Sequence, residues 1–115
     1  MSALTVSFIC HLAFVCRELM PTLAESLNDN GGQVLPHLIM ADYLRIVEGN
    51  SELTEWKTVL LECLEQAMTE EKAEIRELIA VSFIEHLPVS TDAGHWLVGA
   101  LGPNLRKRYR IVFGI

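Results

Sequence analysis

The sequence predicts an all-α fold: a compact bundle of five or six helices built from antiparallel helical hairpins. Apolar residues recur three or four positions apart along most of the 115-residue chain, which is the period of a helix. Seven glycines and four prolines are too few for a β-sandwich, which needs a turn about every 8–12 residues. Half of the residues are hydrophobic, enough for the core of one helical domain spanning residues 1–115.

The first predicted helix covers about residues 3 to 20. Two short strands, "TVSFI" and "HLAFV", are an alternative that the periodicity does not exclude. Pro21 either kinks this helix or begins the next one, where its missing N–H does no harm. Asn, Asp and Gly adopt turn conformations easily, so "SLNDNGG" at 26–32 is predicted to be a loop. The inward stripe of the first helix is expected to comprise Leu4, Phe8, Leu12, Val15 and Leu19.

Two further helices are predicted in the middle of the chain. Pro36 begins the first, and Gly49 is its stop. Ser51 is the predicted N-cap of the second, which covers residues 52–68. The expected inward residues are Leu38, Ile39, Tyr43, Ile46 and Val47 on the first helix, and Leu53, Trp56, Leu60, Cys63, Leu64 and Ala67 on the second.

The segment "EEKAEIRELIAVSFIEHLP" at 70–88 is predicted to be the central helix, because it is apolar on nearly every side after a charged start. Its acidic residues suit the positive end of the helix dipole, and Pro88 ends it. Only a few residues around Thr69 separate it from the preceding helix, so the two should form an antiparallel hairpin. Its expected inward face is Ile75, Leu78, Ile79, Phe83 and Leu87.

The C-terminal part is predicted to hold one or two helices. "STD" at 90–92 caps one that runs to about Leu101, with Trp96, Leu97 and Ala100 facing inward. "PNLRKRYRIVF" is either a sixth short helix or an extended tail. The successive hairpins also resemble a short helical-repeat stack, although about two units do not establish a period.

The charge is unevenly distributed. Residues 1–105 carry fifteen acidic and five basic side chains, a net charge of −10, and "RKRYR" at 106–110 then adds +4. An acidic body argues against non-specific nucleic-acid binding, which depends on Lys and Arg, and favours a basic protein partner. We interpret "RKRYR" as a solvated helix end whose cations suit the dipole or pair with acidic neighbours; a nucleic-acid contact with Tyr109 stacking is the alternative.

No residue pattern predicts catalysis, a metal site or a cofactor. Cys63 with His86, or Ser82 with His86 and Asp92, contain the residue types of a nucleophile and its base, but neither has a local motif. The protein is therefore predicted not to be an enzyme, and an enzyme using Cys63 or His86 is the alternative. No pair of histidines has the three- or four-residue spacing of metal ligands on one helical face; the four are His11, His37, His86 and His95.

The cysteines and the apolar start both favour the cytoplasm. Three cysteines without metal-ligand spacing suggest free, buried thiols in a reducing compartment: Cys10, Cys16 and Cys63. The run at 3–16 lacks the basic region and cleavage site of a signal peptide and is too short to span a bilayer. A membrane interaction is not expected.

Three stretches together resemble a family of small helical bacterial proteins: "LPHLIMADYLRIVEG" (35–49), "LLECLEQAMTEEKAEIRELIAVSFIEHLP" (60–88) and "LVGALGPNLRKRY" (97–109). Members are associated with polymorphic toxin and contact-dependent growth inhibition loci, where they look like immunity proteins. The likeness covers the chain from about residue 18 onward and rests mainly on packing residues. It carries over no catalytic residue.

The resemblance implies a toxin-neutralising protein, and the acidic composition suits a basic nuclease as its target. The protein is expected to be a monomer or weak homodimer that binds its cognate toxin domain directly. A helical-repeat-like adaptor for a different protein partner is the alternative. The expected partner-binding residues are exposed acids and aromatics near helix ends, namely Asp42, Tyr43, Glu48, Glu52, Glu55, Asp92 and Trp96.

Overall fold

The structure, a computed structural model, describes residues 2–89 and 95–115 and confirms the all-α fold. No strand occurs in these two ranges, so the alternative of two short N-terminal strands is wrong. Two 3-10 turns, η1 (Arg17–Leu19) and η2 (Ile84–His86), extend helical segments. The helices are α1 (Ala3–Val15), α2 (Met20–Asp29), α3 (Pro36–Glu48), α4 (Glu55–Met68), α5 (Ala73–Ser82), α6 (Trp96–Gly99) and α7 (Pro103–Phe113).

The N-terminal helix is shorter than predicted. It ends at Val15, and the chain bends by 114° into the segment that contains η1 and α2. Pro21 lies in the first turn of α2, so it begins a helix and does not kink one. The predicted loop at 26–32 begins later, because α2 continues to Asp29. Gly31 and Gly32 then adopt positive φ angles of 64° and 84°, which favour glycine.

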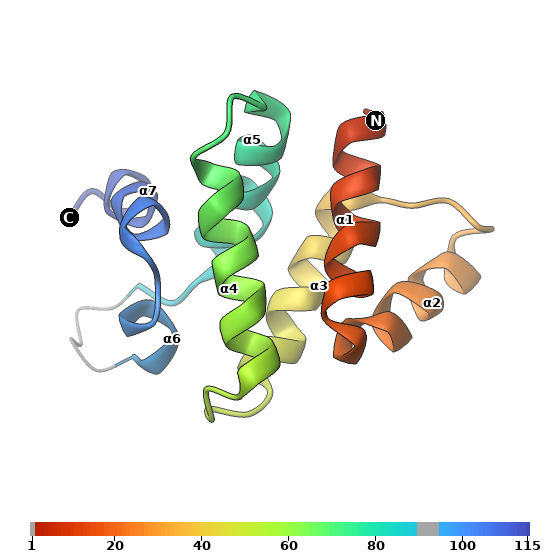
Figure 1. Cartoon of the computed structure of the whole chain (residues 1–115), viewed down its shortest axis with the longest axis horizontal. Coiled ribbons are helices and arrows are strands. Elements are labelled where there is room, and N and C mark those ends of the chain that lie inside the picture. Colours follow the sequence, from red (N-terminus) through yellow and green to blue (C-terminus); the bar gives the residue numbers. More distant parts are fainter. Residues whose placement is uncertain (1, 90–94) are drawn as a thin grey trace.

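The central position of α5 is confirmed. It packs against α1, α3 and α4, and it forms an antiparallel hairpin with α4 (Figure 1). All five predicted inward residues of this segment are buried, together with Ala80 and Ile84. The charged start is placed differently: Glu70 and Glu71 lie in the turn before the helix, and Glu74 lies in its first turn.

The inward faces of α1, α3 and α4 are rotated relative to the prediction. Leu4 and Val15 are exposed on α1, as are Leu38 and Ile46 on α3 and Leu53 before α4. In each segment apolar residues flank the true inward face, so the sequence pattern alone does not fix the rotation of the helix. The residues buried in their place are Thr5, Ile9, Ala13, Met40, Leu44, Lys57 and Leu61.

The start of α4 also differs from the prediction. The helix begins at Glu55, and Thr54 occupies the N-cap position without a side-chain hydrogen bond to the helix. Ser51 lies in the preceding loop and is not the N-cap. The "STD" cap predicted at 90–92 lies outside the described residues.

The segment after Gly102 forms a helix, α7, and not an extended tail. The Glu65 carboxylate of α4 accepts hydrogen bonds from the backbone N–H groups of Asn104 (2.9 Å) and Leu105 (3.0 Å) and from the Asn104 side chain (2.6 Å). Partial burial raises the pKa of Glu65, but these hydrogen bonds outweigh it and hold the pKa below its ordinary value. A side chain of α4 therefore caps α7 from 39 residues away.

We expect Glu65→Gln to destabilise the protein by about 1–2 kcal/mol near neutral pH, because a neutral amide accepts fewer and weaker hydrogen bonds from these donors. Since the folded-state pKa is lowered, this stabilisation is present above the unfolded pKa and is lost as the pH falls through the folded value. Urea unfolding followed by circular dichroism at several pH values measures it. A difference between wild type and variant that does not shrink on acidification would contradict the role of the ionised carboxylate.

No single helix in the described ranges has the length and apolar character needed to cross a membrane; α1 and the η1–α2 segment meet these criteria only as a pair, sharply bent between them.

Candidate functional site

Three predicted contact residues lie where α3 connects to α4. Glu48 ends α3, Glu52 lies in the connecting loop and Glu55 begins α4, and all three are exposed. No cation of the described residues lies within 4 Å of their carboxylates. Asp42, six residues before Glu48 on the same helix, forms an ion pair with Arg45. We call Glu48, Glu52 and Glu55 the acidic edge.

Tyr43 is a core residue, which corrects its prediction as a partner contact. Its side chain is fully buried, and its hydroxyl donates a hydrogen bond of 3.1 Å to the carbonyl of Ile9. Burial raises the pKa of this hydroxyl above its ordinary value. Tyr43 therefore ties α3 to α1 and presents no surface to a partner. Asp92, another predicted contact, lies outside the described residues.

The buried side chain of Lys57 binds the backbone of the loop between Glu48 and Glu55. Its side chain is 2% exposed, and its Nζ donates hydrogen bonds to the carbonyls of Asn50 (2.5 Å) and Glu52 (3.0 Å). The ammonium also lies 5.0 Å from the ring centroid of Trp96 and 5.9 Å from that of Trp56, within range of cation–π attraction. Trp96 is half-buried and contacts Lys57, so it has a structural role, while its role as a partner contact stays a prediction.

The backbone of this loop is further fixed from within. The N–H of Glu52 donates a 2.8 Å hydrogen bond to the side-chain oxygen of Asn50. Together with the Lys57 hydrogen bonds, this bond restrains the backbone at Glu52. A surface fixed before binding loses less entropy on association. This role of Lys57 could not be predicted from local patterns, because a lysine beside an apolar stripe is ordinarily solvated.

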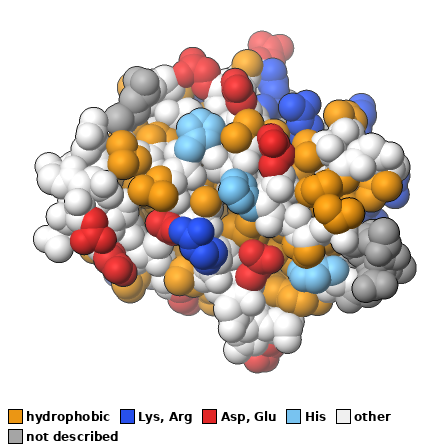
Figure 2. Space-filling view, turned by 180° about the vertical axis from the view of Figure 1, so that it is seen from behind, with side chains coloured by type: hydrophobic (Ala, Val, Ile, Leu, Met, Phe, Trp, Pro, Cys, Tyr) orange, Lys and Arg blue, Asp and Glu red, His pale blue; other side chains and the backbone are white. Residues whose placement is uncertain are grey.

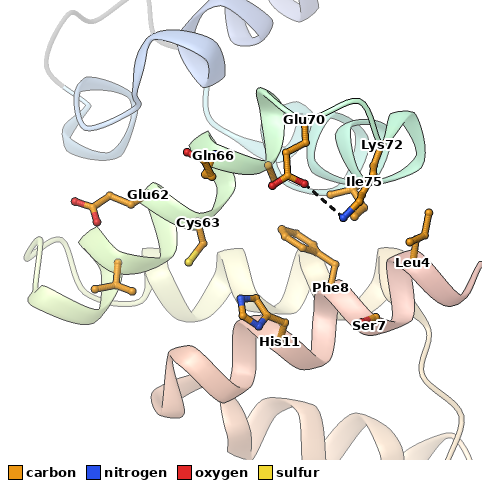
Figure 3. Close-up of a pocket in the computed structure, with 12 residues that line it drawn as sticks. Leu4, Ser7, Phe8, His11, Glu62, Cys63, Gln66, Glu70, Lys72 and Ile75 are labelled. Carbon is orange, nitrogen blue, oxygen red and sulfur yellow. Dashed lines mark ion pairs between the residues drawn. The ribbon is translucent and has the colours of Figure 1, made fainter.

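A groove of about 590 Å³ lies between α1 and α4 and was not predicted. Phe8 projects into the space between the two helices, and His11 and Cys63 lie along its length (Figure 3). Glu62 and Glu70 lie on its α4 side, where Glu70 is 3.5 Å from Lys72. The other residues that line the groove are Leu4, Ser7, Val59, Gln66, Ala67 and Ile75.

The cysteines do not have the environment of an activated nucleophile. Burial, reinforced by the nearby Glu62, raises the pKa of Cys63. Burial, reinforced by Cys63 and Glu18, raises the pKa of Cys16 to about 11. Both thiols are therefore held in the weakly nucleophilic protonated form at neutral pH. Cys16 is buried as predicted, whereas Cys10 is exposed, which corrects its placement in the core.

Ser82 is paired differently from the arrangement considered in the sequence. Its buried hydroxyl lies 2.6 Å from Nδ1 of His37, and this contact joins α5 to α3. His86 is exposed in η2. Among the described residues, no group of three His, Cys, Asp or Glu side chains could hold a metal ion.

The cations of α7 form a separate patch. The side chains of Arg106, Lys107, Arg108 and Arg110 have no ion-pair partner among the described residues, so the pairing proposed for "RKRYR" is not seen there. Figure 2 shows a group of Lys and Arg side chains near the upper right edge, on the side where α7 lies, with carboxylates beside this group and elsewhere on that face. Four of the nine basic residues of the chain are thus concentrated on α7.

Comparison with known proteins identifies a family. Residues 9–113 match the model of a family described as a domain of unknown function (DUF7674). Because the match covers most of the chain, the protein belongs to this family. The matched range includes the second half of α1, whereas the resemblance described from the sequence began at about residue 18. No curated protein and no solved structure matches significantly.

Proposed function

We propose that the protein is an immunity protein that binds a cognate bacterial toxin domain, a basic nuclease, and neutralises it in the cytoplasm as a stoichiometric complex. The observation that carries the proposal is the acidic edge: exposed carboxylates without neutralising cations, at the end of α3, at the start of α4 and on the connecting loop that Lys57 bonds. Nucleases bind polyanions and are basic around their active sites. A rigid anionic surface attracts such a protein and discriminates against acidic ones.

The inhibition needs no chemistry from this chain. Complementary charge accelerates encounter, and the complex then blocks the toxin by occupying its surface. The raised pKa values of Cys16 and Cys63 are consistent with a binding role, because neither thiol is poised for attack.

The proposal predicts that a neighbouring gene encodes the toxin domain, and co-expression with that domain tests it. Wild type should preserve cell growth and co-purify with the toxin domain in a one-to-one complex. Continued cell death without co-purification would contradict the immunity function. Growth and co-purification observed only with a different, non-toxic partner would favour the adaptor.

The triple variant Glu48→Lys, Glu52→Lys, Glu55→Lys should slow association with the toxin domain by roughly 10–100-fold at low salt, because it inverts the steering charge. Stopped-flow association rates at several salt concentrations measure the effect. The matched control is Glu18→Lys, Glu25→Lys, Asp29→Lys, which changes the net charge equally on η1 and α2. Equal slowing by both variants would assign the effect to net charge and not to the acidic edge.

A further inference from the structure

We infer that the groove between α1 and α4 receives an amphipathic helix of the toxin domain, with an apolar ridge in the groove and a Lys/Arg row beside Glu62. This inference rests on the proposed function and specifies which structural element of the partner docks.

The first argument is the composition of α1. From Ala3 to Val15 the helix contains no Asp, Glu, Lys or Arg. A helix of this kind is ordinarily covered on more than one side. Here its buried residues are only Thr5, Ile9, Leu12 and Ala13. Three large apolar side chains remain substantially exposed, Leu4 (42%), Phe14 (69%) and Val15 (39%), and of these Leu4 lines the groove.

The second argument is the shape of the groove. It is bounded by two neighbouring helices, with Leu4 and Phe8 from one side and Val59 and Cys63 from the other (Figure 3). Its volume is about 590 Å³. A valley between packed helices is the site that an amphipathic helix fills, through anchors at i, i+3 or i+4, and i+7.

The third argument is charge, and it selects the occupant. Glu62 is exposed at the groove and has no ion-pair partner among the described residues. Lys72, the cation at the groove, is paired with Glu70. A second copy of this chain, with its own net charge of −6, would bring like charges together. A helix with a cationic flank complements both the apolar floor and the acidic side.

The inference can be tested with a synthetic amphipathic helix of leucine and lysine, about 18 residues or 27 Å long. Its counterpart of leucine and glutamate is the peptide control. We expect Leu4→Lys to weaken binding of the lysine peptide at least tenfold, measured by fluorescence anisotropy. Leu38→Lys is the matched protein control, since it adds the same charge at a leucine of similar exposure (46%) on α3. That variant should change the affinity less than twofold.

Thiol labelling gives a second readout on the wild-type protein. The lysine peptide should slow alkylation of Cys63, which lines the groove, and leave Cys10, which does not, unaffected. Equal affinity of the two leucine variants, or no protection of Cys63, would overturn the inference. Circular dichroism establishes that both variants are folded.

Neutralisation assays with the toxin domain distinguish a failure of this inference from a failure of the proposed function. Neutralisation that is weakened by Leu4→Lys and not by Leu38→Lys supports both. If both variants neutralise the toxin as wild type does, the immunity function stands and the groove is not its docking site. If the peptide binds in the groove but wild type does not neutralise the toxin, the function is wrong.

Two other occupants of the groove, a second copy of this chain and a lipid surface, are tested in parallel. Concentration-dependent dimerisation abolished by Leu4→Lys would assign the groove to a second copy. Sedimentation with phosphatidylcholine–phosphatidylglycerol vesicles abolished by the same change would assign it to lipid. Either result would overturn the inference.

Discussion

Ile79→Asp is expected to unfold the protein. Ile79 is fully buried in α5, the helix that packs against α1, α3 and α4. An aspartate there would place a charge without a partner in the core and remove the packing of the isoleucine. These two losses should exceed about 4 kcal/mol, a large part of the stability of a domain this size.

The measurement is far-UV circular dichroism with urea titration, and the matched control is Val81→Asp. Val81 belongs to the same helix but is 39% exposed, so its substitution should cost no more than about 1 kcal/mol. A soluble, cooperatively folded Ile79→Asp protein would contradict the central position of α5.

Lys57→Met is expected to destabilise the protein by about 3 kcal/mol. The substitution keeps much of the apolar stem but removes the ammonium. The carbonyls of Asn50 and Glu52 then lose a charged donor, which costs about 1.5–3 kcal/mol for such a bond. The cation–π contact with Trp96 is lost as well, at roughly 1 kcal/mol.

This second prediction has a local readout that a general loss of packing would not give. Hydrogen exchange should accelerate in the loop of residues 49–54 before it accelerates in α5. The control is Lys72→Met, which removes an exposed lysine from a surface ion pair and should cost less than about 1 kcal/mol. A Lys57→Met protein as stable as the Lys72→Met protein would show that Lys57 does not hold the loop.

Local patterns in the sequence were sufficient for α5 and insufficient for α1. The charged residues in the first half of α5, Glu74, Arg76 and Glu77, identify its buried face, although its second half is apolar on nearly every side. In α1 such charged residues are absent, and apolar side chains surround the helix. The residues predicted to face inward therefore included Leu4 and Val15, which are exposed.

The features that depend on distant residues could not be predicted. Glu65 and Asn104 are 39 positions apart, and their contact exists only because α7 packs against α4. Lys57 of α4 and Trp96 of α6 are likewise far apart in the sequence, so their contact depends on tertiary packing. The acidic edge was predicted because exposed carboxylates at helix ends are recognisable locally, whereas the groove required the relative placement of α1 and α4.

The contact between Glu65 and α7 has a consequence for the motif "LGPNL". A methyl group on Gly102 would lie 2.5 Å from the Glu65 carboxylate, so the glycine leaves room for that carboxylate to reach the backbone. The same contact fastens the four cations of α7 at one end of a molecule measuring 41 × 31 × 20 Å, with α1 and α2 at the other end (Figure 1). Fixed charges of opposite sign at separate places give the protein a permanent dipole moment. The field of a charged partner exerts a torque on this dipole. The torque turns the approaching molecule so that α7 points away from a cationic surface.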